Sequence, residues 1–263
     1  MDVVAQKRYL IAGYGLPAEF GINTLYGLGV PPSQIAVLTH EEDERNIGLI
    51  SAAKLRGVAL CQKPVKDSLV EEWVRCFSPD ILLSLHYRAR IPETILSIPP
   101  LGGVNLHPSL LPNYRGTNSV AWVLINGESE TGFSYHRMTS DFDEGNILLQ
   151  VRIPIYQHDT AFSLFHRQIV LAIPRLEEVI AMMISGQSGE KQCLEGTYFT
   201  RELPCGGVID PSWDLARIDR FIRAMLFPPF PPASVLIKGT KYMVSSLSEY
   251  VDIAETNDLC IRR

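Results

Sequence analysis

The sequence has few cysteines and no long run of apolar residues. Its five cysteines are odd in number and scattered, and no two of them are spaced as Cys-x-x-Cys. This pattern is typical neither of a zinc site nor of a disulfide framework, so we expect no metal and a reduced, cytoplasmic protein. No stretch approaches the roughly 20 apolar residues that cross a bilayer, and the first residues lack the apolar region of a signal peptide. We therefore expect no membrane insertion.

Positive charge is also scarce. The chain has 24 Lys and Arg against 29 Asp and Glu, which gives a formal net charge of −5. Affinity for nucleic acid depends largely on basic side chains that neutralise phosphates, so we expect no nucleic-acid partner. Hydrophobic residues make up 46% and charged residues 20%, as is usual for a globular protein. A length of 263 residues allows one large domain with a small appendage.

Short apolar runs that resemble β-strands alternate with segments of helical character. The expected strands are Tyr9–Ala12, Ile35–Leu38, Val58–Cys61, Ile81–Leu85 and Gly103–Asn105. The expected helices between them are Ala18–Leu28, Asn46–Arg56 and Ser68–Phe77. This alternation predicts an α/β fold of Rossmann-like type, in which helices cover both faces of a mainly parallel sheet.

Two longer strands are expected next, Thr131–Met138 and Ile147–Ile155, and they could pair antiparallel. A long helical segment then runs from the N-cap residues Asp159-Thr160 to about Ser185, with a kink or break at Pro174.

The character of the chain changes after residue 189. An amphipathic helix is expected over Ser212–Met225, and Phe-Pro-Pro-Phe-Pro-Pro ends it. A hairpin is expected from Val235–Ile237 and Tyr242–Ser245. The sequence therefore predicts a large domain over residues 1–189 and a small C-terminal subdomain over residues 190–263.

The densest group of polar residues follows the strand candidate at Gly103. Asn105 and His107 are two residues apart, so in extended backbone both side chains point to the same side. Ligands of open α/β sheets bind beyond the carboxyl ends of the strands, where this pair is expected. Asp143 lies in the loop between the two longer strands, and Gly145 permits a tight or left-handed backbone there.

These side chains suit acyl transfer to an amine. The Asn105 amide can donate to the oxygen that becomes negative as the carbonyl carbon turns tetrahedral, an effect worth roughly 10²–10³ in rate. His107 can act as a base or as a second oxyanion donor, and Asp143 can hold the histidine or accept the proton. Spacing alone leaves a purely structural role open, because a lone histidine after a strand usually serves packing.

The motif Asn-x-His-Pro-Ser-Leu-Leu-Pro at 105–112, with Tyr-Arg-Gly at 114–116 and Asp-x-Gly at 143–145, resembles the folate-dependent formyltransferase family. The resemblance implies that Asn105, His107 and Asp143 are catalytic, in a formyltransferase domain over residues 1–189, and that N10-formyltetrahydrofolate is the cosubstrate. It also implies that two loops hold the folate, through Arg88, Ala89, Arg90, Ile91, Ser140, Asp141, Phe142 and Gly145.

The C-terminal part of the sequence indicates the class of the acceptor amine. Tyr-Phe-Thr-Arg at 198–201 and the segments 206–213 and 218–233 resemble the nucleotide-sugar N-formyltransferases, and most closely those that act on GDP-perosamine, a 4-amino-4,6-dideoxy sugar. The resemblance implies a role in O-antigen and lipopolysaccharide biosynthesis, and a homodimer. A dTDP-linked 3- or 4-amino sugar, or glycinamide ribonucleotide, is the alternative acceptor.

A nucleotide-sugar site needs groups for the phosphates, the base and the sugar. The amino end of the first helix can receive an anion, and the guanidinium of Arg115 can pair with phosphate. The remaining candidates border the sugar and the nucleotide, although each could simply pack against its neighbours. The substrate-binding candidates are Gly13, Tyr14, Gly15, Leu16, Arg115, Asn118, Trp122, Tyr198 and Arg201.

One alternative of another class is an NAD-dependent oxidoreductase, favoured by the alternating β/α units and by Gly13-x-Gly15. Ala18 replaces the third glycine of that fingerprint, and nothing in this reading explains the motif that begins at Asn105. Hydrolysis of the folate, with water in place of the amine, is a second alternative.

Overall fold

The computed structural model describes residues 3–192, 195–259 and 261 of the chain. They form two compact units, each built from three segments. Unit 1 comprises Met1–His107, Phe133–Gln150 and Ile169–Leu194, and unit 2 comprises Pro108–Gly132, Val151–Gln168 and Glu195–Arg263. The functional division expected near residue 189 stays a prediction.

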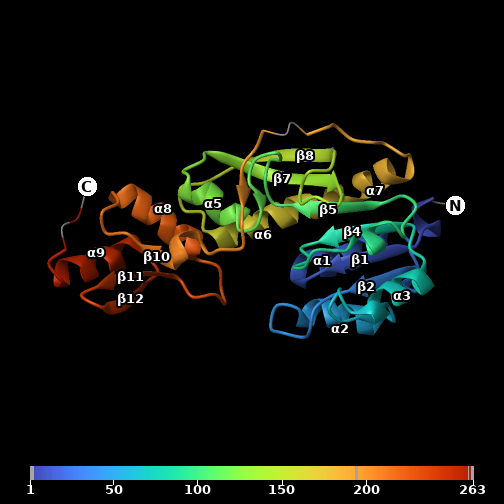
Figure 1. Ribbon diagram of the computed structural model, residues 1–263, viewed down its shortest axis with the longest axis horizontal. Helices are drawn as coiled ribbons and strands as arrows, with labels where there is room; N and C mark the ends of the chain where they lie inside the picture. Colours follow the sequence, from blue (N-terminus) through green and yellow to red (C-terminus); the bar gives the residue numbers. More distant parts are fainter. Residues whose placement is uncertain (1–2, 193–194, 260, 262–263) are drawn as a thin grey trace. The chain divides into compact units, whose positions relative to one another are not determined.

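A seven-stranded sheet of order β3-β2-β1-β4-β5-β7-β8 organises the chain (Figure 1). The pairs β1–β2, β2–β3, β1–β4 and β4–β5 are parallel, and β5–β7 is antiparallel. The strands are β1 (Tyr9–Gly13), β2 (Ile35–Leu38), β3 (Ala59–Cys61), β4 (Ile81–Leu85), β5 (Gly103–His107), β7 (Glu130–Arg137) and β8 (Ile147–Pro154). The predicted α/β fold with a mainly parallel sheet is confirmed.

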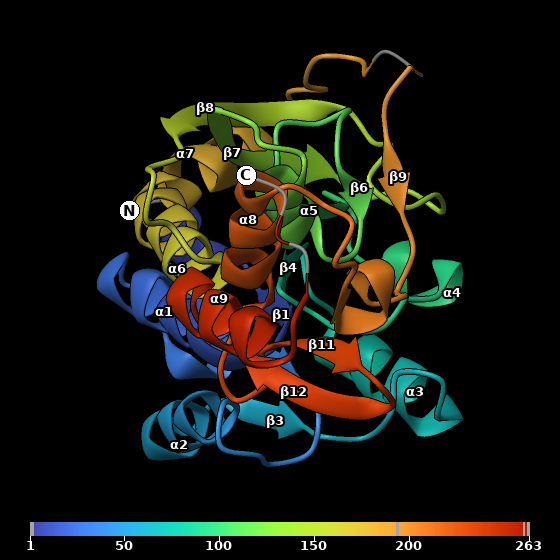
Figure 2. The same ribbon diagram turned by 90° about the vertical axis from the view of Figure 1, so that its left-hand side faces the viewer.

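Helices cover both faces of the parallel strands in unit 1. Every residue of β1 is buried, as expected of a central strand between two helical layers. On one face, Val70 and Val74 of α3 and Ile95 of α4 pack with Leu10 and Leu82 of the sheet. Helix α1 contacts α2 and α7, and these helices lie apart from α3 and α4 (Figure 2). The helices are α1 (Gly15–Gly27), α2 (Ile47–Arg56), α3 (Ser68–Phe77), α4 (Glu93–Leu96) and α7 (Leu176–Ile184).

The long helical segment breaks where proline predicts it. α6 (Ala161–Ala172) is followed by a 3-10 turn, Ile173–Arg175, which contains Pro174, and then by α7. At the start of α6, the Ser163 N–H donates to the Thr160 hydroxyl, and the Thr160 N–H donates to the Ser163 hydroxyl. This reciprocal pair satisfies N–H groups at the helix start that would otherwise lack partners.

Unit 2 holds the C-terminal elements. The expected hairpin is β11 (Ala233–Ile237) with β12 (Thr240–Val244), and β10 (Val208–Ile209) pairs parallel with β11. The expected amphipathic helix is α8 (Leu215–Met225), which contacts α5 (Ser119–Ile125). A last helix, α9 (Leu247–Thr256), was not predicted and contacts α8 and β12.

One further pairing in unit 2 was not predicted. β6 (Arg115–Gly116) and β9 (Tyr198–Phe199) lie side by side as a parallel pair (Figure 2). The remaining short elements are the 3-10 turns Val4–Gln6, Pro32–Gln34 and Pro204–Gly207.

The described residues contain neither a membrane-spanning helix nor a cluster of metal ligands. No helix in ranges 3–192 and 195–259 has both the length and the hydropathy needed to span a bilayer. No three His, Cys, Asp or Glu side chains within the same ranges are grouped as ligands for a metal ion.

Candidate active site

The carboxyl end of β5 brings the first two predicted catalytic side chains to one side of the sheet. The alternation of side chains along a strand places Asn105 and His107 on the same face, and both contact Asp143. The Asn105 amide nitrogen lies 3.4 Å from Oδ1 of Asp143, and Nδ1 of His107 lies 3.5 Å from Oδ2. The structure therefore brings the three predicted catalytic residues together.

A second histidine, which was not predicted, completes this cluster. His136 on β7 lies directly opposite Asn105 in the antiparallel pair, and such cross-strand pairs have adjacent side chains. Its Nε2 is 3.0 Å from the Asn105 amide nitrogen and 3.3 Å from Oδ1 of Asp143. Only the register of β5 against β7, which the sequence does not reveal, could have identified it.

The hydrogen-bond pattern indicates which His136 nitrogen carries the proton. Nδ1 lies 2.9 Å from the carbonyl oxygen of Arg137, which can only accept, so Nδ1 donates. The Asn105 amide nitrogen can only donate, so Nε2 of His136 accepts from it. In this arrangement the amide NH₂ of Asn105 serves both His136 and Asp143.

Asp143 approaches this cluster from the loop after β7. Its backbone is left-handed, with φ of 56°, and the residue is 8% exposed. We expected Gly145 to permit a tight or left-handed backbone. The left-handed residue of the loop is Asp143, and the backbone at Gly145 is tight, because a Cβ there would lie 1.8 Å from the carbonyl oxygen of Arg137.

The two loops predicted to hold the folate are joined by Arg90. Its Nη2 donates to the carbonyl oxygen of Ser140 at 2.6 Å, and its guanidinium carbon lies 5.4 Å from the centre of the Phe142 ring. Phe142 is exposed, whereas Ile91 is buried. The joined loops thus offer an apolar ring beside backbone polar groups, a combination that suits a flat heteroaromatic such as a pterin.

Most of the remaining residues of these loops are exposed or half-buried, and Gly145 is buried. Ser140 and Asp141 are exposed and Ala89 is half-buried. The guanidinium carbon of Arg88 lies 4.8 Å from the centre of the Tyr14 ring, so this side chain reaches the end of β1.

The segment after β1 is mostly buried. The Gly15 N–H donates to Oδ1 of Asn46 at 3.1 Å, so this helix-start amide already has a partner. Gly13 is in close packing, because a Cβ there would lie 2.3 Å from Cβ of Ala18, and Leu16 is half-buried. Ligand contact by Gly13, Tyr14, Gly15 and Leu16 stays a prediction.

Tyr14 is linked to the loop after β2. Its hydroxyl donates to Asp43 at 2.5 Å. Burial and this hydrogen bond raise the pKa of Tyr14. Burial by itself would raise the pKa of Asp43, but the bonds from Tyr14 and from the N–H groups of Arg45 and Asn46 together lower it.

The other predicted substrate-binding residues gather in unit 2, around the pairing of β6 with β9. Phe199 stacks between two rings, with its centroid 4.4 Å from that of Trp122 and 5.6 Å from that of Tyr114. Gly116 is needed where these strands meet, since a Cβ would lie 2.1 Å from the carbonyl oxygen of Phe199. We call Tyr114, Phe199 and Trp122 the ring stack.

Polar bonds fix the same two segments together. The Tyr114 N–H donates to the hydroxyl of Thr197 at 2.8 Å, and the Asn118 amide donates to the carbonyl oxygen of Glu202 at 3.3 Å. Arg115 and Tyr198 are opposite each other in the strand pair. Residues 114–118 therefore form one structure with residues 197–202.

Exposure differs among the candidates at the ring stack. Arg115 is 5% exposed, whereas Tyr198 is 55% exposed and Arg201 is also exposed. The Nε1 donor of Trp122 is buried, and no acceptor for it lies among the described residues. Unit 2 thus groups the exposed Tyr198 ring and the exposed Arg201 with the buried Arg115 and the buried indole donor of Trp122.

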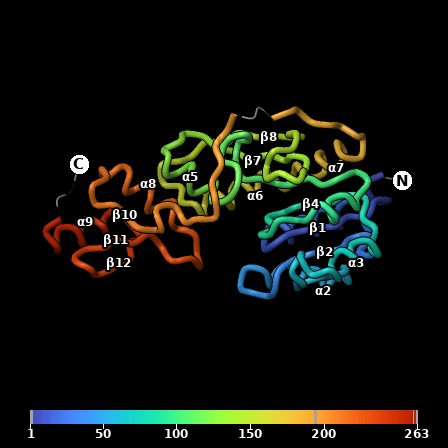
Figure 3. The backbone as a smooth tube through the Cα atoms, viewed as in Figure 1, coloured from blue at the N-terminus to red at the C-terminus, as the bar shows by residue number. Residues whose placement is uncertain are grey.

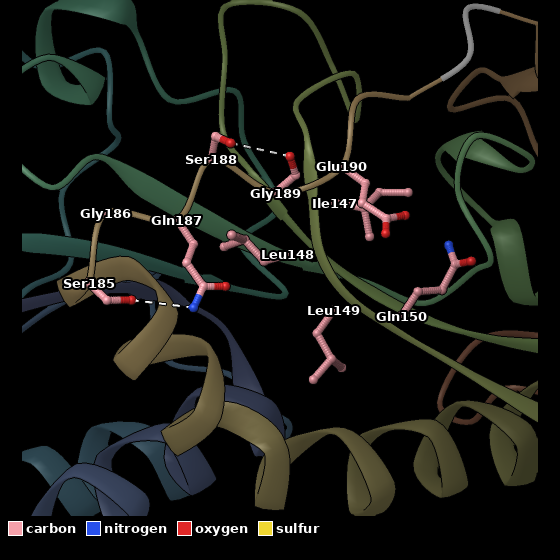
Figure 4. A pocket seen from close by; sticks show the side chains of 10 residues that line it. All are labelled: Ile147, Leu148, Leu149, Gln150, Ser185, Gly186, Gln187, Ser188, Gly189 and Glu190. Atoms are coloured by element: carbon pink, nitrogen blue, oxygen red, sulfur yellow. Dashed lines mark hydrogen bonds between the residues drawn. The ribbon is translucent and has the colours of Figure 1, made fainter.

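An open groove of about 790 Å³ lies elsewhere in unit 1. Residues 147–150 of β8 line one side and residues 185–190 the other (Figure 4). None of the predicted catalytic or binding residues lines it.

A sequence profile of the family described as Formyl transferase matches residues 33–172. GDP-perosamine N-formyltransferase of Brucella melitensis is 56% identical over 250 residues, which cover 95% of this chain and 96% of that protein.

Solved structures show the same fold. A 4-N formyltransferase from Francisella tularensis has a TM-score of 0.74 at 17% identity, covering 92% of this chain and 97% of its own. The N-formyltransferase from Helicobacter canadensis, in complex with folinic acid and dTDP-3-aminofucose, has a TM-score of 0.73 at 22% identity, covering 89% and 86%.

Proposed function

The chain belongs to the formyl transferase family, and from this premise we propose that it formylates the amino group of a GDP-linked 4-amino-4,6-dideoxy sugar of the perosamine type. The formyl donor is N10-formyltetrahydrofolate. The observation that carries the acceptor is the 56% identity to a GDP-perosamine N-formyltransferase, which covers both units of this chain. The similar Helicobacter canadensis structure, with folinic acid and an amino-sugar nucleotide, supports this pair of substrates.

In this proposal the sugar amine attacks the formyl carbon directly. The amine nitrogen forms a bond to that carbon, the carbonyl oxygen becomes negative, and the bond to folate N10 then breaks with its electron pair. N10 gains one proton and the amine loses one. No serine or cysteine nucleophile is needed, because the acceptor itself is the nucleophile.

Asn105 stabilises the negative oxygen in this scheme. Its amide NH₂ contacts His136 at 3.0 Å and Asp143 at 3.4 Å, so the longer contact is the one that gives way to the substrate oxygen. The contact with His136 then keeps the amide oriented. A preorganised donor of this kind is worth roughly 10²–10³ in rate.

His107 and Asp143 manage the proton. With Nδ1 of His107 directed at Oδ2 of Asp143, the ring's Nε2 is the nitrogen available for the substrate. A carboxylate beside an imidazole favours its protonated form, which can donate to the oxyanion or to the departing N10. Asp143 accepts the proton of the amine directly or through water.

The folate and the nucleotide sugar bind different regions of the chain. The folate pterin lies against the loops that Arg90 joins, residues 88–91 and 140–145, and the nucleotide sugar is recognised by the region of the ring stack. The guanidinium groups of Arg115 and Arg201 pair with the diphosphate, and the Trp122 indole donates to the acceptor. The Asn118 amide and the exposed Tyr198 ring border the sugar and the base.

We also propose a cellular location, an oligomeric state and a biosynthetic role for the enzyme. It acts in the cytoplasm as a homodimer, in O-antigen and lipopolysaccharide biosynthesis. Light scattering of the purified chain tests the dimer, and a monomer mass at assay concentrations contradicts it.

Mass spectrometry of reaction products tests the function. The enzyme is supplied with N10-formyltetrahydrofolate and, in separate reactions, GDP-perosamine, dTDP-linked 3- and 4-amino sugars, and glycinamide ribonucleotide. We expect a gain of one formyl group on GDP-perosamine at the highest kcat/KM. Faster formylation of a dTDP-sugar would move the assignment to that acceptor, and formate release without any acceptor would indicate hydrolysis.

A further inference from the structure

Asp143 requires support from outside its own loop. Its left-handed backbone, with φ of 56°, is a conformation that residues with a Cβ rarely adopt. Its carboxylate contacts are already long, because Oδ1 lies 3.4 Å from the Asn105 amide nitrogen and Oδ2 lies 3.5 Å from Nδ1 of His107. They therefore tolerate little displacement of the carboxylate. Hydrogen bonds of this kind are usually near 2.9 Å, so a further shift of about 0.5 Å ends either contact.

Gln192 supplies such support. Its amide nitrogen donates to the carbonyl oxygen of Asp143 at 2.8 Å and to that of Gly145 at 2.6 Å. A primary amide has two hydrogens, so both are used on the carbonyls that flank Glu144. Gln192 is 6% exposed, and a buried amide bonded at both hydrogens has a fixed position.

The segment that carries Gln192 is itself fixed to the β7–β8 hairpin. We call residues 185–192 the strap, and Figure 3 shows the chain after α7 running beside β8. Ile147 and Glu190 exchange two backbone hydrogen bonds of 2.8 Å, and the Asn146 amide donates to the carbonyl oxygen of Ser188 at 3.1 Å. The strap lies opposite the residues of β8 that line the open groove (Figure 4).

Arg137 anchors the strap from the sheet side. Its guanidinium donates to the carbonyl oxygens of Gln187 and Leu101. Arg137 precedes the loop of Asp143, and its own carbonyl accepts from His136. The strap, the loop and β7 thus form one bonded structure, with Gln192 at the contact closest to Asp143.

We propose that Gln192 is a positioning residue for formyl transfer. It holds the backbone at Asp143 and Gly145 so that the Asp143 carboxylate stays within reach of His107 when the Asn105 amide turns to the substrate oxygen. This inference rests on the proposed role of Asp143 in the reaction. Gln192 touches neither substrate, so its loss lowers kcat and leaves KM for both substrates unchanged.

Two substitutions remove the donors while keeping the size of the side chain. Gln192→Glu places an acceptor against two carbonyl oxygens, and Gln192→Met fills the same space without polarity. We expect each to lower kcat by about 10²-fold, as misplacement of a reacting group by about 1 Å does, with KM within about threefold of wild type. Gln192→Met is the second variant because a carboxylate at this buried position can unfold the chain.

Asn146→Ala is the matched control. It removes an amide that also joins the hairpin to the strap, but that amide bonds Ser188 and not the Asp143 loop carbonyls. We expect its kcat to stay within about threefold of wild type. A kcat within threefold for Gln192→Met as well, or an equal fall for Asn146→Ala, would overturn the proposal.

Hydrogen exchange gives a readout that does not depend on the substrate. Peptides covering residues 139–146 are expected to exchange at least tenfold faster in Gln192→Met than in wild type, while peptides of β1 and β4 are unchanged. Unchanged protection of residues 139–146 would overturn the inference even if the enzyme used another acceptor. Absence of formyl transfer by wild-type protein, with faster exchange in the variant, would instead reject the proposed function and retain the support of the loop.

Discussion

Unit 1 and unit 2 each gather a set of predicted functional residues, but they do so by different means. In unit 1, Asn105, His136 and Asp143 form a buried polar cluster with three contacts between 3.0 and 3.4 Å. In unit 2, the ring stack lies next to exposed side chains such as Tyr198, which precedes Phe199 in the chain. Buried polar networks define one geometry, which transition-state stabilisation requires, whereas exposed rings and guanidinium groups suit the recognition of a large polar ligand.

The contrast leads to a division of kinetic effects. Variants in the polar cluster should change kcat, and variants around the ring stack should change KM or stability. Each of the following measurements tests that division.

The largest effect is expected in the polar cluster. Asn105→Ala, His107→Ala and Asp143→Ala should each lower kcat by at least about 100-fold, because each removes an oxyanion or acid/base group. Steady-state kinetics with both substrates measure this, and KM should change by less than about threefold. Three variants with near wild-type turnover would place the chemistry elsewhere.

Arg201→Ala should show the opposite pattern. Loss of a charge-assisted bond to a phosphate costs about 1.5–3 kcal/mol, so KM for the nucleotide sugar should rise by roughly tenfold or more. Turnover at saturation should stay within about threefold. Arg217→Ala serves as the control, because this arginine packs on Trp213, which is no part of the ring stack. A fall in kcat without a change in KM would contradict the proposal that unit 1 variants change kcat and unit 2 variants change KM.

Phe199→Leu should mainly lower stability. The substitution removes both ring pairs of the stack while retaining apolar volume, and ring pairs are worth about 0.5–1.5 kcal/mol each. We expect the free energy of unfolding to fall by about 1–2 kcal/mol, measured by urea denaturation. KM for the nucleotide sugar should rise a few-fold, because Tyr198 and Arg201 flank Phe199 along the chain. A free energy of unfolding equal to that of wild type would contradict a stabilising role for the ring stack.

The smallest effect compares two tyrosines, one in each unit. The Tyr114 hydroxyl in unit 2 bonds Glu128 at 2.5 Å and accepts from Asn126 at 3.1 Å. The buried hydroxyl of Tyr87 in unit 1 has no partner within the described part of the chain. Tyr114→Phe should therefore cost about 1 kcal/mol of unfolding free energy, and Tyr87→Phe should be neutral or slightly stabilising. Urea denaturation of both variants measures the difference, and equal losses would contradict it.

The same tyrosines predict the response to alkaline pH. Burial raises the pKa of Tyr87 to about 12, and burial with the bond to Glu128 raises that of Tyr114 to about 12. Because both values lie above the unfolded value of about 10, their contribution to stability is complete below pH 10 and falls as pH rises toward 12. Urea denaturation in this range should show the decline, and Tyr87→Phe should reduce it.

The fold was predictable where local sequence determines structure. β2, β4 and α3 begin and end at the predicted residues, since apolar runs and capping residues mark them. β5 extends two residues beyond its predicted end, to His107. The helix α9 was missed although its Ser-x-x-Glu start signal is visible: the Ser246 hydroxyl accepts from the Glu249 N–H, and the Glu249 carboxylate accepts from the Ser245 N–H.

The site was only partly predictable for a physical reason. Asn105 and His107 share a strand, so alternation alone places them together, and a motif indicates their partner Asp143. His136 and Gln192 reach the same cluster through strand register and through the strap, which depend on contacts between distant segments. The two-residue pairing of β6 with β9 is likewise too short to leave a pattern in the sequence.

The alternation of six segments between the two units bears on how this enzyme is synthesised. A ribosome releases the chain from its amino end, so two segments of unit 2 emerge before the last segment of unit 1 does. Neither unit can complete its contacts early, and the polar cluster lacks the support of Gln192 until residue 192 of 263 has appeared. Domains usually fold one after another during translation, but in this interleaved chain unit 1 lacks helix α7, at Leu176–Ile184, until two segments of unit 2 have appeared. Its folding in the cell should therefore depend on chaperones more than its length alone would indicate.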